Sequence, residues 1–145
     1  MKLKDRQLYR KISDAFFNYM VYGGKEEEKQ KLKSCIMQIG ETHSDLFLYQ
    51  EPIKNYNIGM MAVICGFEDI VKMALNNKKA CTQQDILGYN IGMLLLEKGN
   101  YNLAAIAYKN KDARKQLNFW KDNMDSIAKK KGINLEDFED EQDIL

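Results

Sequence analysis

The residues best suited to covalent chemistry are a single histidine and three cysteines. His43 lies in the loop-like run Gly-Glu-Thr-His-Ser-Asp, and Cys35 precedes it across an expected helix end. A cysteine nucleophile needs a histidine base within hydrogen-bond distance of its sulfur. A solvated loop histidine and small buried thiols explain these residues better than a catalytic pair does. The sequence therefore predicts a protein that is not an enzyme.

Metal, cofactor and disulfide patterns are absent from the sequence. Cys35, Cys65 and Cys81 are odd in number and widely spaced, which fits neither a zinc motif nor a disulfide framework. No glycine-rich loop of the phosphate-cradling type occurs. The aspartates fall at expected turns and helix starts, where capping explains them. We therefore expect no cofactor, no metal ligand and three reduced thiols in a cytoplasmic protein.

Basic residues gather in the C-terminal third, from Lys109 to Lys131. Eight bases there outnumber three acids, and Tyr108, Phe119 and Trp120 are interleaved with them. Such a pattern could bind nucleic-acid phosphates directly, which is one alternative function, although a solvated terminal face explains it more simply. The candidate basic patch consists of Lys121, Lys129, Lys130 and Lys131.

An acidic tail follows the basic residues directly. Between residues 136 and 143 the chain carries six acids and no base. Such a run could fold over the basic residues or imitate phosphates toward a basic partner. It suggests a second alternative function, the inhibition or regulation of a nucleic-acid-binding enzyme. The tail residues are Glu136, Asp137, Glu139, Asp140, Glu141 and Asp143.

The chain as a whole is close to electrical neutrality. It has 145 residues, enough for one domain with a real core, and 22 basic against 21 acidic residues give a net charge of +1. That balance produces no general attraction to nucleic acids or anionic membranes. No apolar run reaches membrane-spanning length, and the N-terminus lacks the apolar segment of a secretory signal.

An internal repeat predicts the elements that position these residues. The pentapeptide Tyr-Asn-Ile-Gly-Met at 56–60 returns at 89–93, 33 residues later, and 12 of 31 residues are identical between 50–80 and 83–113. The identities outside the pentapeptide are Gln50/Gln83, Ile53/Ile86, Gly66/Gly99, Ala74/Ala107, Asn77/Asn110, Lys78/Lys111 and Ala80/Ala113. A fainter third copy places Gln116, Asn123, Lys131 and Gly132 at matching positions.

Apolar spacing of three and four residues predicts an all-α fold in a single domain. Asn57 and Asn90 are expected to cap the first helix of each central unit, and Gly66 to end it. Leu135 and Phe138 are expected to dock from a short final helix. The expected helices are 5–22, 25–39, 58–65, 68–76, 91–98, 101–110 and 123–131. The expected units are an N-terminal cap (1–46), two repeats (47–79 and 80–112) and a C-terminal cap with the acidic tail (113–145).

The unit of turn, short helix, glycine break and longer helix resembles the ankyrin repeat. Residues 66–75 (Gly-Phe-Glu-Asp-Ile-Val-Lys-Met-Ala-Leu) follow the second half of the family pattern, and residues 85–90 follow the first half. Asn-Ile-Gly-Met replaces the family's Thr-Pro-Leu-His in both central units. Gly59 and Gly92 each cost a helix about 1 kcal/mol relative to alanine, which close packing between units would offset. The resemblance implies an α-solenoid of about four helix pairs with divergent N- and C-terminal caps.

The resemblance also implies where a partner would bind, because ankyrin units make most partner contacts through their fingertips and first helices. The 33-residue period places apolar residues in rows along both. We therefore expect a scaffold that binds another protein, of unknown identity, through a concave or fingertip surface, with no membrane and no nucleic acid. The other explanation is that these side chains pack between the units. The predicted anchors are Tyr56, Met61, Leu87, Tyr89, Leu94 and Trp120.

Overall fold

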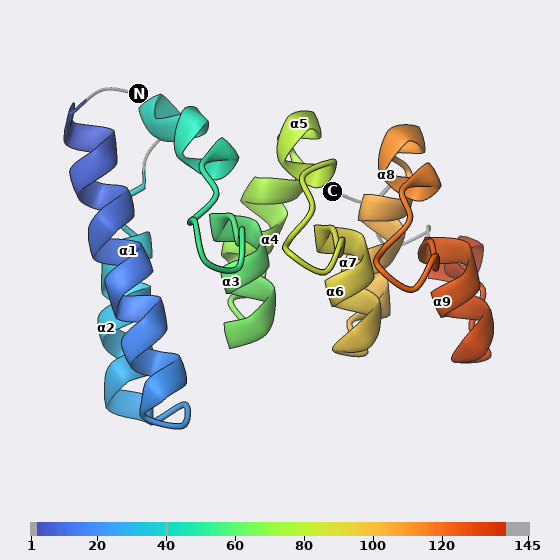
Figure 1. The fold of residues 1–145 in the computed structure, drawn as a ribbon, viewed down its shortest axis with the longest axis horizontal. Coiled ribbons are helices and arrows are strands. Elements are labelled where there is room, and N and C mark those ends of the chain that lie inside the picture. Colours follow the sequence, from blue (N-terminus) through green and yellow to red (C-terminus); the bar gives the residue numbers. More distant parts are fainter. Residues whose placement is uncertain (1–2, 40, 139–145) are drawn as a thin grey trace.

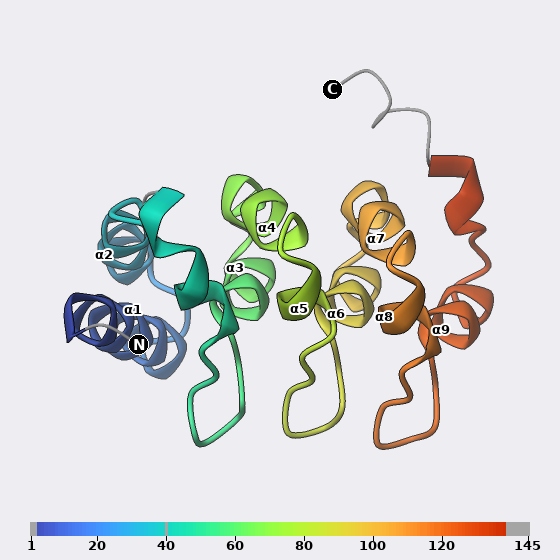
Figure 2. The same cartoon turned by 90° about the horizontal axis from the view of Figure 1, so that it is seen from above.

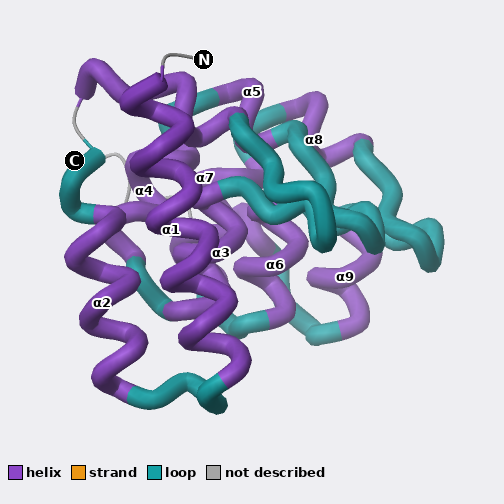
Figure 3. Tube along the Cα trace, turned by 60° about the vertical axis from the view of Figure 1, so that its left-hand side comes forward, coloured by secondary structure: helices purple, strands orange, loops and turns teal. Residues whose placement is uncertain are grey.

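The computed structural model describes residues 3–39 and 41–138, and for residues 41–44 it describes the backbone alone. All regular structure in these residues is helical, so the predicted all-α class is confirmed (Figure 3). The helices are α1 (Leu3–Val21), α2 (Glu26–Ile36), α3 (Ile58–Cys65), α4 (Glu68–Leu75), α5 (Lys78–Cys81), α6 (Ile91–Glu97), α7 (Tyr101–Tyr108), α8 (Lys111–Lys115) and α9 (Met124–Lys130). Two 3₁₀ helices, η1 (Glu41–Leu48) and η2 (Leu135–Phe138), complete them.

The helices follow one another in pairs along the long axis of the molecule (Figure 1). Antiparallel neighbours pack within the pairs α1–α2, α3–α4 and α6–α7. Between pairs, α3 packs against α6, α6 against α9, and α4 against α7. The apolar core therefore runs through the molecule from one unit to the next instead of gathering at one centre.

Three long loops project from the same side of this row, opposite α4 and α7 (Figure 2). Each loop lies directly before the first helix of a pair, ahead of α3, α6 and α9 respectively. We call them finger 1 (residues 50–56), finger 2 (residues 84–89) and finger 3 (residues 117–122). Finger 1 is one residue longer than the other two.

Asparagines fix where the first helix of each pair begins. The Oδ1 atoms of Asn57 and Asn90 accept hydrogen bonds of 2.9 Å from the backbone N–H three residues later, at Met60 and Met93. Asn123 makes the same bond in a capping box with Ser126. These caps satisfy backbone donors that a helix start otherwise leaves free. The predicted starts are therefore confirmed, and left-handed Gly66 ends α3 as expected.

The same asparagine amides also connect one unit to the next. Asn57 Nδ2 donates to Gln83 Oε1 at 2.9 Å, and Gln83 in turn donates to the carbonyl of Leu48. One repeat later, Asn90 Nδ2 donates to Gln116 Oε1 at 3.0 Å. Both asparagines are fully buried, so their hydrogen bonds replace the water that they lose on folding. We call this arrangement the asparagine relay.

The two helix glycines allow the pairs to approach each other closely. A Cβ atom on Gly59 would lie 2.6 Å from Ile91 Cδ1 and 2.7 Å from Ala74 Cβ. On Gly92 it would lie 2.6 Å from Met124 Cε. A side chain at either position would therefore force neighbouring units apart. The expected compensation for two glycines inside helices, close packing between units, is confirmed.

Two short helices, α5 and α8, were absent from the sequence prediction. The side chains of Asn77 and Asn110 each cap one of them by accepting from the N–H of Ala80 and Ala113, both at 3.1 Å. The repeated Asn-Lys-x-Ala segment was visible in the sequence as identities at 77–80 and 110–113. These identities do not by themselves predict a helix, because a single turn is too short for apolar periodicity to reveal.

Different elements cover the two ends of the row of helix pairs. At the N-terminal end, α1 covers the base of finger 1, where Tyr9 donates to the Tyr56 carbonyl at 3.3 Å. At the C-terminal end, η2 packs against α7, with Leu135 buried and the Phe138 ring 5.9 Å from the Tyr101 ring. The expected docking of Leu135 and Phe138 is therefore confirmed.

Asn90→Ala is expected to lower the free energy of unfolding by about 2–4 kcal/mol. The substitution removes a helix cap, leaves the Gln116 side-chain oxygen without its donor and takes away one of the two donors to the Ala113 carbonyl. Urea unfolding followed by circular dichroism measures the change.

Asn100→Ala is the matched control. Asn100 caps α7, but its other hydrogen bond goes to the exposed side chain of Glu68. Losing that cap should lower the unfolding free energy by about 1 kcal/mol. Equal destabilisation by the two substitutions would contradict the role assigned to the asparagine relay.

Candidate partner-binding surface

Each finger is closed by an acceptor side chain near its base. The Glu51 carboxylate accepts from the N–H groups of Ile53 and Lys54, at 2.7 and 2.6 Å. Asp85 accepts from Leu87 and Tyr89 in finger 2, and Asn118 accepts from Trp120 and Asp122 in finger 3. All three acceptors are buried. They hold the chain in a tight turn that places the residues at each tip away from the helices.

Burial has opposite effects to hydrogen bonding on the Asp85 carboxyl. Burial raises its pKa, while the hydrogen bonds donated by the N–H groups of Tyr89 and Leu87 lower it. The carboxylate thus replaces lost solvent with backbone donors. In finger 3 the equivalent residue is Asn118, whose Nδ2 atom is enclosed and has no hydrogen-bond partner among the described residues. The amide reproduces the acceptor of Asp85 and adds a donor that this finger does not use.

Hydrogen bonds also join the fingers to one another. The Ile86 N–H donates to the Lys54 carbonyl, and the Phe119 N–H donates to the Leu87 carbonyl, both at 2.8 Å. A Cβ atom on Gly88 would lie 2.8 Å from the Asn118 Cα, so only glycine allows this contact between fingers. The three fingers therefore form one connected row.

Two glutamine side chains reinforce the row. Gln50 Nε2 donates to the Gln84 carbonyl at 2.9 Å, and Gln84 Nε2 donates to the Leu117 carbonyl at 3.0 Å. Gln50 is thus the structural equivalent of Gln84, although the 33-residue period aligns it with Gln83. The extra residue in finger 1 shifts the register by one, which the sequence comparison did not detect.

Large apolar side chains lie exposed along this row. Their exposed fractions range from 45% to 74%, so the tips present a mostly unburied apolar surface. On finger 3 the Trp120 ring lies 5.7 Å from the Phe119 ring and 6.0 Å from the Tyr89 ring, in edge-to-face geometry. We call this set the fingertip surface. It consists of Ile53, Ile86, Leu87, Leu117, Phe119 and Trp120.

Of the six predicted anchors, two have exposed side chains, as expected. Leu87 and Trp120 are exposed, and Tyr89 is partly exposed beside the Trp120 ring. Tyr56 is partly buried because its ring packs edge-on against Phe16 of α1, at 5.8 Å. No pattern in the sequence indicates that α1 covers finger 1, because the N-terminal helices do not share the repeat.

The first-helix part of the predicted surface is wrong at Met61. Its side chain is fully buried in the apolar core, and α3, which carries it, packs against α4, α6 and η1. Leu94, one repeat later, is only partly buried and also packs against the core. The alternative left open by the sequence, that these side chains pack between units, is therefore correct for Met61.

Several residues of the fingertip surface were not among the predicted anchors. Ile53, Ile86 and Phe119 fall at matching positions of the 33-residue period and are all exposed. That alignment was the signal that could have singled them out. The 33-residue period aligns Leu117 with Gln84, and the shifted register of finger 1 hides only its equivalence to Gln50.

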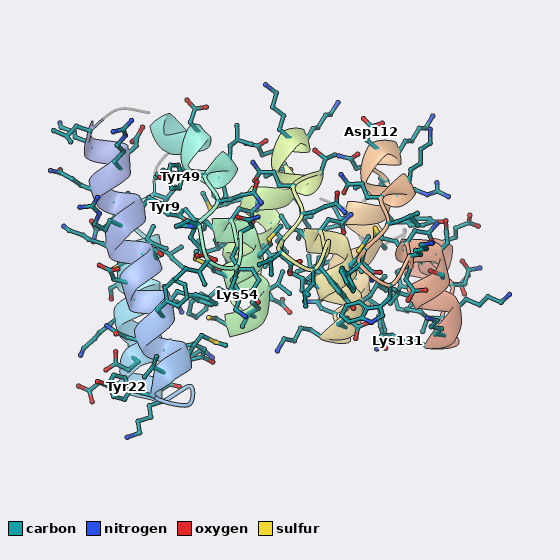
Figure 4. All side chains as sticks on the ribbon, viewed as in Figure 1. Tyr9, Tyr22, Tyr49, Lys54, Asp112 and Lys131 are labelled. Carbon is teal, nitrogen blue, oxygen red and sulfur yellow. The ribbon has the colours of Figure 1, made fainter. Side chains whose placement is uncertain are left out.

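The predicted basic patch is partly neutralised by neighbouring acids. Lys130 bonds to both carboxylate oxygens of Asp122, at 2.9 and 2.8 Å, and this contact holds the Asp122 pKa below its ordinary value. Lys131 lies 3.9 Å from Glu97 (Lys131 is labelled in Figure 4). Lys121 and Lys129 are exposed, and neither makes an ion pair with a residue that the structure describes. Two of the four lysines therefore remain available to a partner.

The acidic tail is described only at its beginning. Glu136 and Asp137 are exposed on η2, which packs against α7. The remaining tail residues, Glu139, Asp140, Glu141 and Asp143, lie outside the described residues.

The groups that could do chemistry are poorly placed for it. Burial raises the pKa of the Cys65 thiol to about 12 and that of Cys81 to about 11, so neither forms a thiolate near neutral pH. No three potential metal ligands gather among the side chains of the described part of the chain. The side chain of His43 is outside that part.

Comparisons with protein-family models, with curated proteins and with solved structures found no significant match. No helix within residues 3–39 and 41–138 is long and apolar enough to cross a bilayer.

Thiol labelling at pH 8 is expected to separate the three cysteines. Cys35 is partly exposed and should react readily, whereas the buried and protonated Cys65 and Cys81 should react only as the protein unfolds. Titration with a chromogenic disulfide, with and without denaturant, counts them. Three fast thiols in the native protein would contradict the burial of Cys65 and Cys81, and fewer than three in denaturant would reveal a bridge.

Proposed function

We propose that this chain is a non-catalytic scaffold that binds another protein through the fingertip surface. The proposal includes its architecture, a divergent ankyrin-like α-solenoid of about four helix pairs. The observation that carries it is a row of hydrogen-bonded fingers whose tips expose large apolar side chains. Exposed apolar surface destabilises a free protein in water and usually marks a site of interaction. A loop with a purely structural role would be expected to carry polar residues at its tip, which avoid this free-energy cost.

Pre-organisation supports the same conclusion. The acceptors Glu51, Asp85 and Asn118 and the bonds between fingers fix the tips before any partner arrives. A partner then loses little free energy in ordering the loops on binding. Trp120 is the strongest single anchor, because tryptophan combines a large apolar area with few rotamers to restrict.

The other proposed functions receive less support from the geometry. Lys130 and Lys131 are engaged with acids, which weakens direct nucleic-acid binding through the basic patch. A catalytic role has no activated nucleophile among the described side chains. Three free thiols suit a reducing compartment such as the cytoplasm. We therefore place protein binding first, and inhibition of an enzyme would be one form of it.

The test compares what the protein captures with and without its fingertips. We would immobilise the wild type, the variant Ile53→Ser/Ile86→Ser/Phe119→Ser, and the control Val21→Ser/Met37→Ser, and expose each to a lysate of the source cells. The control removes exposed apolar side chains from α1 and the end of α2, which lie outside the three finger segments. Circular dichroism should show equal helical content, because every changed residue is exposed.

A protein held by the wild type and the control but lost from the fingertip variant is the expected result. Once that partner is identified, a single Trp120→Ala substitution should raise the dissociation constant about thirtyfold, which corresponds to about 2 kcal/mol of binding free energy. Equal capture by the fingertip variant and the wild type would overturn the proposal.

A further inference from the structure

The backbone hydrogen bonds between fingers all point the same way. In fingers 2 and 3, a backbone N–H donates to a carbonyl of the preceding finger. The Ile86 N–H in finger 2 and the Phe119 N–H in finger 3 make this bond. The equivalent donor in finger 1 is the Ile53 N–H, which has no preceding finger. It donates instead to Glu51 Oε2 of its own finger, at 2.7 Å. The N-terminal side of the row is therefore closed by the chain itself.

The C-terminal side of the row has no such closure. The Trp120 carbonyl occupies the position at which the Lys54 and Leu87 carbonyls accept from the next finger, yet no described residue donates to it. The glutamine that reaches from finger to finger is replaced by Leu117. Finger 3 also holds the unused donor of Asn118 Nδ2. The backbone bond and the glutamine bond that join neighbouring fingers therefore both stop at finger 3.

The side chains at this end suit an apolar neighbour. A terminal unit in a stacked array normally has a polar outer face, and α9 follows that rule with exposed Asp125 and Lys129. Finger 3 does not, because Leu117, Phe119 and Trp120 are exposed by 52%, 74% and 58%. Half of the fingertip surface is therefore concentrated on the last finger.

We propose that finger 3 is a docking edge on which an extended segment of a different protein adds as a fourth finger. A backbone N–H of that segment donates to the Trp120 carbonyl, and an apolar side chain packs on Phe119 and Trp120. Adding a segment to an open backbone edge is a general mode of peptide recognition. The inference rests on the proposed function and assigns the partner's position and chemistry.

The charges on finger 3 specify the segment further. Lys121 is exposed at the tip, next to Trp120, and it has no acidic partner among the described residues. The one nearby acid of the finger, Asp122, is bonded to Lys130. A carboxylate on the incoming segment would therefore find a free ammonium group, which makes an apolar and acidic sequence the preferred occupant.

A second copy of this chain fits the edge poorly. In head-to-tail stacking, finger 1 of the copy would have to donate its Ile53 N–H, which Glu51 already holds. In a symmetric contact between two copies of finger 3, the Trp120 carbonyls would face each other as acceptors without donors, and the two Lys121 side chains would repel. Both arrangements leave polar groups unpaired, so the occupant is a different chain.

The probe is a cyclic peptide that copies residues 83–90, Gln-Gln-Asp-Ile-Leu-Gly-Tyr-Asn. This segment contains finger 2 and the donor N–H of Ile86. The matched control is the same peptide N-methylated at that isoleucine, which lacks the donor. Trp120 is the only tryptophan of the chain, so its fluorescence and its carbonyl ¹³C resonance report on this edge alone.

The parent peptide is expected to change both signals in a saturable manner. N-methylation should weaken the effect at least about fivefold, the factor that a hydrogen bond worth about 1 kcal/mol contributes. No response to the parent peptide at millimolar concentration, or an equal response to both peptides, would overturn the inference.

A pair of substitutions separates this inference from the proposed function. Ile53 and Phe119 occupy matching fingertip positions at opposite ends of the row and are exposed by 63% and 74%. Phe119→Ser should abolish capture of the partner, whereas Ile53→Ser, at the opposite end of the fingertip surface, should weaken it by a much smaller factor. Equal loss with both substitutions would mean that the partner lies along the whole row, so the proposed function would stand and the docking edge would not.

Discussion

Two buried asparagine amides, Asn57 and Asn90, set the spacing of the whole structure. Each Oδ1 atom starts the first helix of its own unit, and each Nδ2 atom donates to the backbone and to a glutamine of the next unit. Helix initiation and unit spacing are thereby fixed by one side chain. Because these amides are fully buried, losing the hydrogen bonds of either Oδ1 or Nδ2 would leave a buried polar group unpaired, at a cost in folding free energy.

The position of the fingers follows from this spacing. With the first helices held at a fixed separation, and with no side chain on Gly59 or Gly92 to push them apart, the loops before them come into register. The bonds from Ile86 to Lys54 and from Phe119 to Leu87 can then form at exposed tips, where water would otherwise compete for them. An ordered apolar surface on loops is thus a consequence of how the helices stack. Within the first helices themselves, α3, α6 and α9, the large apolar residues are buried or partly buried.

Local signals in the sequence were sufficient for the longer helices and insufficient for the short helices α5 and α8 and for the surface. The 33-residue period and the residues Asn57, Asn90 and Gly66 marked the helix ends because capping depends on a few neighbouring residues. Exposure depends on which elements pack together, and no local pattern indicated that Met61 would be fully buried while Leu94, one repeat later, is only partly buried. The one-residue shift at finger 1 was also hidden, because Glu51 closes that finger from a position that the period aligns with Gln84.

The most direct measurement is amide hydrogen exchange at Ile86 and Phe119 in the free protein. Both N–H groups lie at solvent-exposed tips, so only the bonds between fingers can protect them. If the fingers form one pre-organised row, these two amides exchange orders of magnitude more slowly than in an unfolded chain, on the scale of the capped amides of Met60 and Met93. Exchange of Ile86 and Phe119 at unfolded-chain rates, with Met60 and Met93 still protected, would show that the fingers are independent loops and would contradict the account.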